Sequence, residues 1–217
     1  MLKIKNPLKA TLTALSLAVV ICHIPAPVQA VEIETKAREA LLLDSTTGTV
    51  LLDKNADQRM PPASMSKLMT IYLLFESIKD GRVSLEDKFR VSENAWRKGG
   101  SASGGSTMFL PPNSEVRVED LIQGIVVQSG NDACIVVAEN LAGSEEAFAR
   151  RMTDKAREIG MTNSNFVNST GWPDPDHHTT AHDLAVLAKR TIHDFPEFLH
   201  YYSELEFTYN KIRQSNR

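Results

Sequence analysis

One apolar segment constrains the fold of this chain more than any other part of it. Residues 62–77 read PASMSKLMTIYLLFES, and nearly every side chain of residues 68–75 is apolar. A surface helix keeps one polar face, so a helix that is apolar on nearly all sides belongs inside a domain. Lys79 and Gly81 then supply a basic last turn and a glycine stop. The segment therefore predicts a buried, central helix.

The first turn of this helix carries a hydroxyl and an amine, Ser64 and Lys67. Positions three apart lie on one face of a helix, so the two side chains can touch. Burial would lower the pKa of the Lys67 amine, and the positive end of the helix would favour negative charge on Ser64. The pair predicts a serine nucleophile with a lysine base. The alternative is chance, since a Ser-x-x-Lys spacing arises about once in a chain of this length.

A second polar break lies in the stretch IVVQSGNDACIVVAEN, where Ser129, Gly130 and Asn131 separate two apolar helical runs. A short loop at this point would reach back into the interior. We expect it to bring a second hydroxyl and an amide to the pocket of Ser64. A plain helix-capping turn is the alternative, because Ser and Asn also favour caps.

Strand patterns flank a mostly helical middle of the chain. Two apolar runs, 40–43 and 49–52, are separated by turn residues and predict a hairpin. Alternation over residues 205–209 predicts a further strand. Helical patterns with cap signals at Ser144 and Thr180 cover four segments: 119–128, 131–141, 144–160 and 184–192. No linker divides this order into separate domains.

The strand signals leave the sheet short of strands. A two-stranded hairpin is marginal alone, and a sheet needs at least a third strand. Strand patterns return only in the last residues of the sequence. We therefore expect part of the sheet to lie beyond Arg217.

The N-terminus has the pattern of a secretory signal. Three lysines precede an apolar stretch over residues 10–24, and residues 28–30, VQA, offer small side chains for cleavage. Two prolines break the segment before the roughly 20 residues needed to span a bilayer, which argues against the alternative, an uncleaved anchor helix. We expect residues 1–30 to be a signal peptide and residues 31–217 to be an exported, periplasmic chain.

Composition excludes several other classes of protein. The formal charge is −3, and no stretch combines dense Lys and Arg with aromatics, so we expect no nucleic-acid partner. His178 and His182 are four apart, but a helix that begins after Thr180 leaves His178 in the preceding loop, and we expect no metal site. We expect no cofactor either. Cleavage of the signal would leave Cys134 alone, as a small core residue without a disulfide.

Four stretches carry a resemblance to a known family. They read ALLLDSTTGTVLLDKNADQRMPPASMSKLMT, LIQGIVVQSGNDACIVVAENLAGSEEAF, MTNSNFVNSTGWPDPDHHTTAHDLAVLA and FTYNKIRQSNR. Over essentially all of residues 37–217 the chain resembles the low-molecular-weight penicillin-binding proteins that are D-alanyl-D-alanine carboxypeptidases. The motifs are highly specific to that family.

The resemblance implies a role for each candidate residue. Ser64 would be the acyl-enzyme nucleophile, and Lys67 would be the base that activates it. Ser129 would pass a proton toward the departing D-alanine, and Asn131 would hydrogen-bond a backbone amide of the substrate. His178 falls in a family stretch close to the pocket mouth and receives no catalytic role.

The resemblance also implies a fold, a reaction and partners. The fold would be β-lactamase/transpeptidase-like, an α/β fold of the α+β type with an antiparallel sheet flanked by helices and an inserted helical region. The reaction would release the terminal D-alanine of peptidoglycan stem pentapeptides through an acyl-serine. β-Lactam antibiotics would be inhibitors. An amphipathic C-terminal anchor beyond this chain would bind the inner membrane.

Two other functions compete with this interpretation. A β-lactamase of the same fold would carry Asp at position 130 and a Glu-x-x-Leu-Asn element, but this chain has Gly130 and no Leu-Asn pair. A fragment or pseudoenzyme that binds peptidoglycan without turnover is the second. It is favoured by the absence from the sequence of the family's Lys-Thr-Gly element, which binds the substrate carboxylate.

Overall fold

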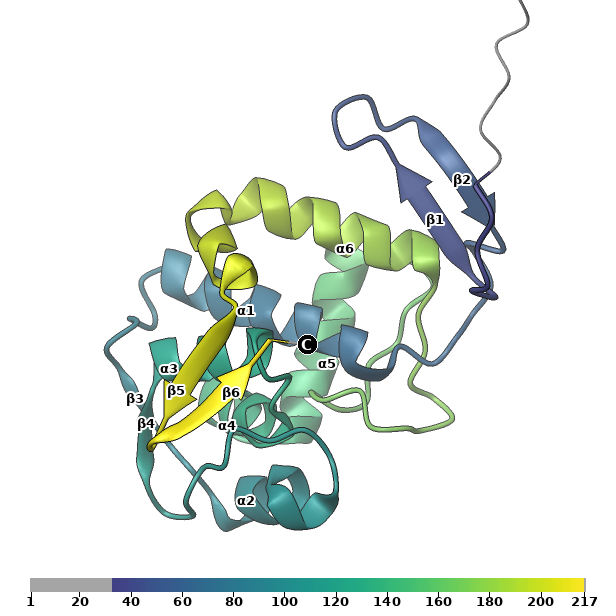
Figure 1. Ribbon diagram of the computed structural model, residues 1–217. Helices are drawn as coiled ribbons and strands as arrows, with labels where there is room; N and C mark the ends of the chain where they lie inside the picture. The colour runs from purple at the N-terminus through teal and green to yellow at the C-terminus, as the bar shows by residue number, and fades with distance from the viewer. Residues whose placement is uncertain (1–32, 217) are drawn as a thin grey trace, which may run out of the picture. The chain divides into compact units, whose positions relative to one another are not determined.

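In the computed structural model, which describes residues 33–216, helix α1 (Lys67–Lys79) lies at the centre of the fold (Figure 1). The first residues of the predicted helix instead form η1 (Ala63–Ser66), a 3₁₀ turn that holds Ser64. The other elements are β1 (Ala40–Leu43), β2 (Val50–Lys54), β3 (Lys88–Arg90), α2 (Glu93–Gly99), η2 (Ser101–Ser103), β4 (Glu115–Arg117), α3 (Val118–Val126), α4 (Asn131–Ala142), α5 (Glu145–Glu158), α6 (Ala181–Asp194), η3 (Pro196–Ser203), β5 (Glu206–Tyr209) and β6 (Ile212–Ser215).

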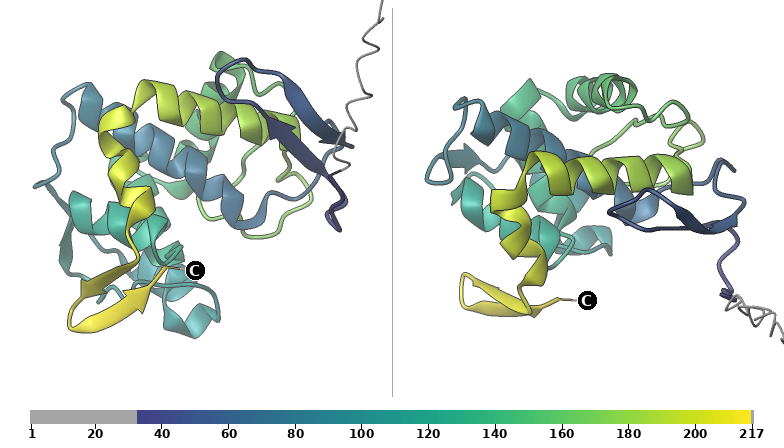
Figure 2. Two further views of the ribbon diagram at one scale, coloured as in Figure 1. Left: turned by 45° about the horizontal axis from the view of Figure 1, so that its top comes forward. Right: turned by 90° about the horizontal axis from the view of Figure 1, so that it is seen from above.

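Helix α1 is buried because four other helices surround it. It contacts α3, α4, α5 and α6, and Figure 2 shows α6 running beside it. Met69, Leu74 and Phe75 have no exposed surface. Each fully buried side chain of this size contributes about 1.5–3 kcal/mol. The predicted central helix is confirmed, and its burial gives the adjoining turn η1 a rigid support.

The longer helices follow their sequence patterns closely, and their caps explain where they begin. The Ser144 hydroxyl accepts a hydrogen bond of 3.1 Å from the Ala147 amide at the start of α5. The Thr180 hydroxyl accepts one of 3.0 Å from the Asp183 amide at the start of α6. Both satisfy N–H groups that a helix start leaves without partners. Helix α2 and strands β3 and β4 were not predicted, because three to seven residues are too few to show a period.

The described residues form no continuous sheet. Their strands form three separate antiparallel pairs: β1 with β2, β3 with β4 and β5 with β6. β1 contacts α6, whereas β5 contacts α3, and Figures 1 and 2 show these two hairpins at different ends of the helices. The mixed helix-and-strand class is confirmed, and the predicted hairpin over β1 and β2 is present. The single antiparallel sheet that we expected is here reduced to separate pairs.

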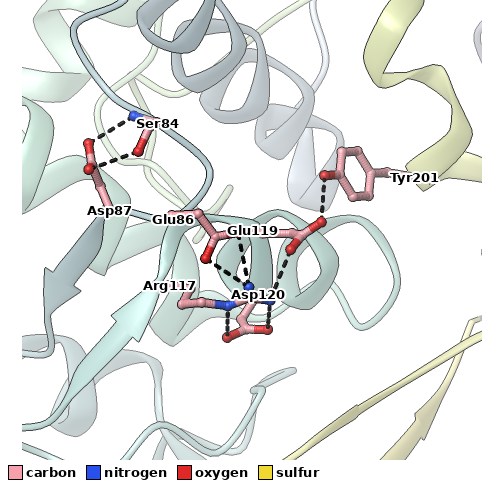
Figure 3. A network of polar contacts seen from close by, with 7 residues as sticks. All are labelled: Ser84, Glu86, Asp87, Arg117, Glu119, Asp120 and Tyr201. Carbon is pink, nitrogen blue, oxygen red and sulfur yellow. Dashed lines mark hydrogen bonds and ion pairs between the residues drawn. The ribbon is translucent and has the colours of Figure 1, made fainter.

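A polar network joins the start of α3 to the chain on either side of it (Figure 3). The Arg117 guanidinium lies 3.1 Å from Glu86, 2.9 Å from Glu119 and 3.4 Å from Asp120. Asp120 and Glu86 raise the pKa of Arg117. Glu119 also accepts a hydrogen bond of 3.3 Å from the Tyr201 hydroxyl of η3. The network therefore ties α3, which leads to the second polar break, to the element that precedes β5.

Two expectations concern the membrane, a spanning helix and the N-terminal signal. No helix among them has the length and apolarity that a bilayer span requires. The predicted signal peptide, residues 1–30, lies outside the described residues.

Candidate active site

Ser64 and Lys67 meet as their spacing predicts. Ser64 is exposed at the end of the central helix, while Lys67 opens α1 and is 5% exposed. The Lys67 Nζ donates to Ser64 Oγ at 3.0 Å and to the Thr170 carbonyl oxygen at 2.8 Å. A buried amine held by a neutral carbonyl and aimed at a hydroxyl can exchange a proton with that hydroxyl.

Ser129 completes a pocket of about 390 Å³ with this pair. The remaining walls are mostly apolar side chains of α1, α3 and α6, together with Tyr202. Three of the predicted site residues, Ser64, Lys67 and Ser129, therefore line one cavity. Its apolar walls reduce the dielectric around Lys67, which strengthens the contact between Lys67 and Ser64.

Unusual backbone geometry presents two of these residues. Ser129 has φ 60°, and Ala63, directly before Ser64, has φ 47°. Both values lie in the left-handed region, which costs a non-glycine residue about 1–2 kcal/mol. The Ser129 amide donates to the Ile125 carbonyl at 3.0 Å, so the turn after α3 is held in place despite the strain.

Asn131 lies beside this pocket rather than in it. It is 7% exposed at the first turn of α4 and lines a neighbouring cavity of about 550 Å³. Thr170, whose carbonyl binds Lys67, lines that cavity too. We expected Asn131 to share the pocket of Ser64; the two residues instead line two different cavities.

The turn that carries Ser129 and Asn131 is clamped by residues 104–110. We call this segment the Asp132 loop, because the side chain of Asp132, in α4, binds it. The buried Asp132 carboxylate accepts hydrogen bonds from the Thr107 hydroxyl at 2.6 Å and from the Met108 and Leu110 amides at 2.9 and 3.0 Å. Each bond is charge-assisted and therefore stronger than a neutral one. Asp132 thus fixes a loop against the turn beside Asn131.

The turn that carries Ser64 is clamped by residues 164–179, which we call the His177 loop. Within this loop the Asn168 side-chain oxygen accepts from the amides of Thr170, Gly171 and Trp172 at 3.2, 2.8 and 3.0 Å. Gly171 has φ 84°, and a Cβ there would lie 1.7 Å from the Ala63 carbonyl oxygen. The loop backbone therefore approaches the turn that carries Ser64 as closely as only glycine permits.

The sequence drew attention to His178, but the structure buries its neighbour. His177 is 3% exposed, and its Nε2 lies 2.8 Å from the Ser66 hydroxyl, between Ser64 and Lys67 in the chain. Burial lowers the pKa of His177 to about 4. His178 is partly exposed, and its Nδ1 lies 3.1 Å from the Asp176 carbonyl. The two histidines are adjacent, and the loop has no regular period. The sequence therefore gives no signal for which of them faces the interior.

Other candidate groups are accounted for by packing. Burial raises the pKa of the Cys134 thiol to about 12, which removes its reactivity as a thiolate. Within residues 33–216, no group of three His, Cys, Asp or Glu side chains could hold a metal ion. His182 lies in α6, while His178 lies in the loop before it, as expected.

The comparison with known families agrees with this geometry. A sequence model described as D-alanyl-D-alanine carboxypeptidase matches residues 26–217. The chain belongs to the D-alanyl-D-alanine carboxypeptidase family. The family resemblance seen in the motifs is therefore confirmed.

Relatives within this family are similar over most of the chain. D-alanyl-D-alanine carboxypeptidase DacC of Escherichia coli (strain K12) is 44% identical over 182 residues, which cover 83% of this chain and 46% of DacC. The chain spans about half the length of the curated relatives it matches. Similarity to these carboxypeptidases thus bears on about half of their length.

Solved structures of the carboxypeptidase family and its relatives share the fold. Penicillin binding protein 5 from Haemophilus influenzae is 37% identical with a TM-score of 0.81, over 85% of this chain and 53% of that one. Penicillin-Binding Protein D2 from Listeria monocytogenes, in its ampicillin-bound form, is 25% identical with a TM-score of 0.70, over 85% and 73%. The penicillin-binding, transpeptidase-like fold is confirmed.

Proposed function

We propose that the protein is a serine-type D-Ala-D-Ala carboxypeptidase that removes the terminal D-alanine from peptidoglycan stem pentapeptides. The observation that carries the proposal is the 3.0 Å contact between Lys67 Nζ and Ser64 Oγ, with Lys67 buried and held by the Thr170 carbonyl. Membership of the carboxypeptidase family supports it.

In the proposed acylation, Ser64 Oγ attacks the carbonyl carbon of the bond between the two D-alanines. Lys67, as the neutral amine, takes the hydroxyl proton across the same 3.0 Å contact. The C–N bond then breaks: Ser129 passes its proton to the nitrogen of the departing D-alanine, and Lys67 returns to Ser129 the proton that it took from Ser64. The product is an ester between Ser64 and the shortened peptide.

In the proposed deacylation, water attacks the ester and restores the Ser64 hydroxyl. Asn131 holds the peptide through a backbone amide while this happens. Its place in the neighbouring cavity of about 550 Å³ suits the part of the substrate that stays attached, because the leaving D-alanine departs from the smaller pocket. The proposal thus assigns the two cavities to the two halves of the substrate.

Two further parts of the proposal follow from the same site. β-Lactams would acylate Ser64, and the related D2 protein, which has been solved with ampicillin bound, supports this. The protein would act in the periplasm after cleavage near residue 30, which the signal pattern of the sequence supports.

The test is labelling of the full-length protein by a fluorescent penicillin, together with release of D-alanine from a stem pentapeptide. Ser64→Ala is expected to abolish both. Ser45→Ala, an exposed serine in the turn after β1, is the matched control and should leave both unchanged. Undiminished labelling of Ser64→Ala would remove Ser64 from the reaction.

The same experiment distinguishes the competing functions. A protein that binds peptidoglycan without turnover would release no D-alanine from the pentapeptide. A β-lactamase would hydrolyse a chromogenic cephalosporin over many cycles, whereas a carboxypeptidase remains acylated by it. We expect D-alanine release and a long-lived acyl-enzyme.

A further inference from the structure

The His177 loop touches the nucleophile turn at three points. Gly171 lies against the Ala63 carbonyl, and the Thr170 carbonyl accepts from Lys67. The third point is the bond between His177 and the Ser66 hydroxyl. The second contact belongs to the proposed catalytic machinery, but no role has yet been given to the third.

The contact between Ser66 and His177 is fully buried. Ser66 has no exposed surface, His177 is 3% exposed, and the two residues are 111 positions apart in the chain. A buried polar group without a hydrogen-bond partner lowers the stability of the fold, so the bond between Ser66 and His177 stabilises both side chains in their places. The ring of Phe166 meets the imidazole edge-on, with centroids 5.6 Å apart, and fixes the plane of the ring.

The neighbours of the ring determine its tautomer. The Val167 amide lies 3.5 Å from His177 Nδ1, and a backbone N–H can only donate, so Nδ1 carries the lone pair. The proton of the neutral ring is then on Nε2, which donates to Ser66 Oγ. The imidazole is neutral near pH 7, because burial lowers the pKa of His177 to about 4.

We propose that His177 is a positioning residue for acylation. Its Nε2–H bond to Ser66 holds the His177 loop on η1, and so keeps the Thr170 carbonyl on Lys67. Asn168, which binds the amides of Thr170 and Gly171, makes the loop stiff enough to transmit this constraint. The inference rests on the proposed roles of Ser64 and Lys67, and it adds the group that aligns them.

Acid would release this contact. A proton on Nδ1 would point at the Val167 N–H, so the charged ring does not fit the loop. The charges that face the ring are Asp174, which raises the pKa of His177, and His178, which lowers it. The other charged group beside this contact is Lys67, which directly follows Ser66 in the chain. The rate of acylation should therefore fall further as the pH falls toward 4, because protonation of His177 releases the loop.

The test compares two substitutions of His177 in the full-length protein. A glutamine side chain can place an N–H near the position of Nε2 and does not titrate, whereas phenylalanine keeps a ring but has no donor. The readouts are the second-order rate of labelling by a fluorescent penicillin at pH 7.5 and the melting temperature. A misplaced reacting group can cost up to about 10²-fold in rate, so we expect His177→Phe to lose about 10- to 100-fold.

The other variants should follow from the hydrogen bond. His177→Gln should retain the rate within about threefold, because it keeps the donor. Ser66→Ala should be as slow as His177→Phe, and the double variant should be no slower than either one. From pH 6 to pH 4, the rate of the natural protein relative to that of His177→Gln should fall, because only the natural protein has a titrating side chain at position 177.

Several results would overturn the inference. They are a wild-type rate for His177→Phe, equal losses for His177→Gln and His177→Phe, or a pH-independent ratio. A loss of rate that only tracks a lower folded fraction at the assay temperature would overturn it too. Ser64→Ala is assayed in parallel: if it stays labelled, the proposed function fails, whereas an unlabelled Ser64→Ala beside a fast His177→Phe contradicts the positioning role alone.

Discussion

The Asp132 loop clamps the turn of Ser129 and the His177 loop clamps the turn of Ser64, but they do so with different chemistry. The first is held by a carboxylate with no exposed surface, which binds two backbone amides and a hydroxyl of the loop. The second touches the turn of Ser64 through a carbonyl, a glycine and a neutral imidazole. The two loops therefore differ in the charge of the groups that hold them: a carboxylate holds the first, and neutral groups hold the second against the turn of Ser64.

The proposed role of Lys67 explains this difference. A carboxylate close to an amine favours the ammonium form, and a base must be able to exist as the free amine. The His177 loop does have carboxylate anchors, Glu145 and Asp183, but these bind it at Ser169 and Ser164 and not at its contacts with the turn of Ser64. The contacts of the loop with the turn of Ser64 are therefore made by neutral groups, while Glu145 binds the loop at Ser169, the residue before Thr170.

The sharpest test of the charged anchor is Asp132→Ala. It leaves the buried donors of Thr107, Met108 and Leu110 without their acceptor, and we expect a loss of about 4–5 kcal/mol in the free energy of unfolding. Urea denaturation measures it. Asp154→Ala, which removes an exposed carboxylate of α5, is the control and should change stability by less than about 0.5 kcal/mol. Equal effects would mean that Asp132 is no anchor.

The close approach of the neutral anchor is tested by Gly171→Ala. Its Cβ would lie 1.7 Å from a backbone oxygen, and φ is 84°, so the loop must move away from η1. We expect a loss of about 3 kcal/mol in unfolding free energy, together with slow acylation. Gly104→Ala, in the other loop, has φ 76° but no atom within 4 Å of the added Cβ. It should lose only about 1 kcal/mol, and a similar loss at both sites would contradict the contact with Ala63.

The stiffness of the neutral anchor depends on Asn168, so Asn168→Ala is expected to weaken it. The change removes the acceptor of three loop amides at a half-buried site, and water can replace part of it. We expect a loss of about 2 kcal/mol, which is smaller than that of Asp132→Ala because neutral hydrogen bonds contribute less. Asn168→Asp keeps an acceptor and should lose less in the same urea titration. A larger loss for Asn168→Ala than for Asp132→Ala would reverse the comparison.

The smallest effect is a pH dependence of stability through His177. Its pKa is lowered from 6.5 to about 4 on folding, so between these values the unfolded chain binds a proton that the folded chain does not. Stability is thus intact above pH 6.5 and declines as the pH falls toward 4. Relative to pH 8, we expect the natural protein to lose about 1–1.5 kcal/mol more at pH 5.5 than His177→Gln does. Parallel stability curves for the two proteins would refute this.

Part of the fold and part of the site could be predicted because they depend on neighbours in sequence. The central position of α1 follows from its apolar residues, and the caps Ser144 and Thr180 follow from side chains that reach an amide three residues on. Strands β3 and β4 and helix α2 escaped prediction because they are too short to show a period and form by pairing with segments elsewhere.

The sequence by itself determined the pair of Ser64 and Lys67, because three residues along a helical turn bring two side chains together whatever surrounds them. Tertiary structure alone decided what holds that pair: the Thr170 carbonyl, 103 positions away from Lys67, and His177 rather than His178 on Ser66. It also placed Asn131 in the neighbouring cavity. Contacts over such separations arise when the core packs, and no local spacing of residues encodes which side of a loop then faces inward.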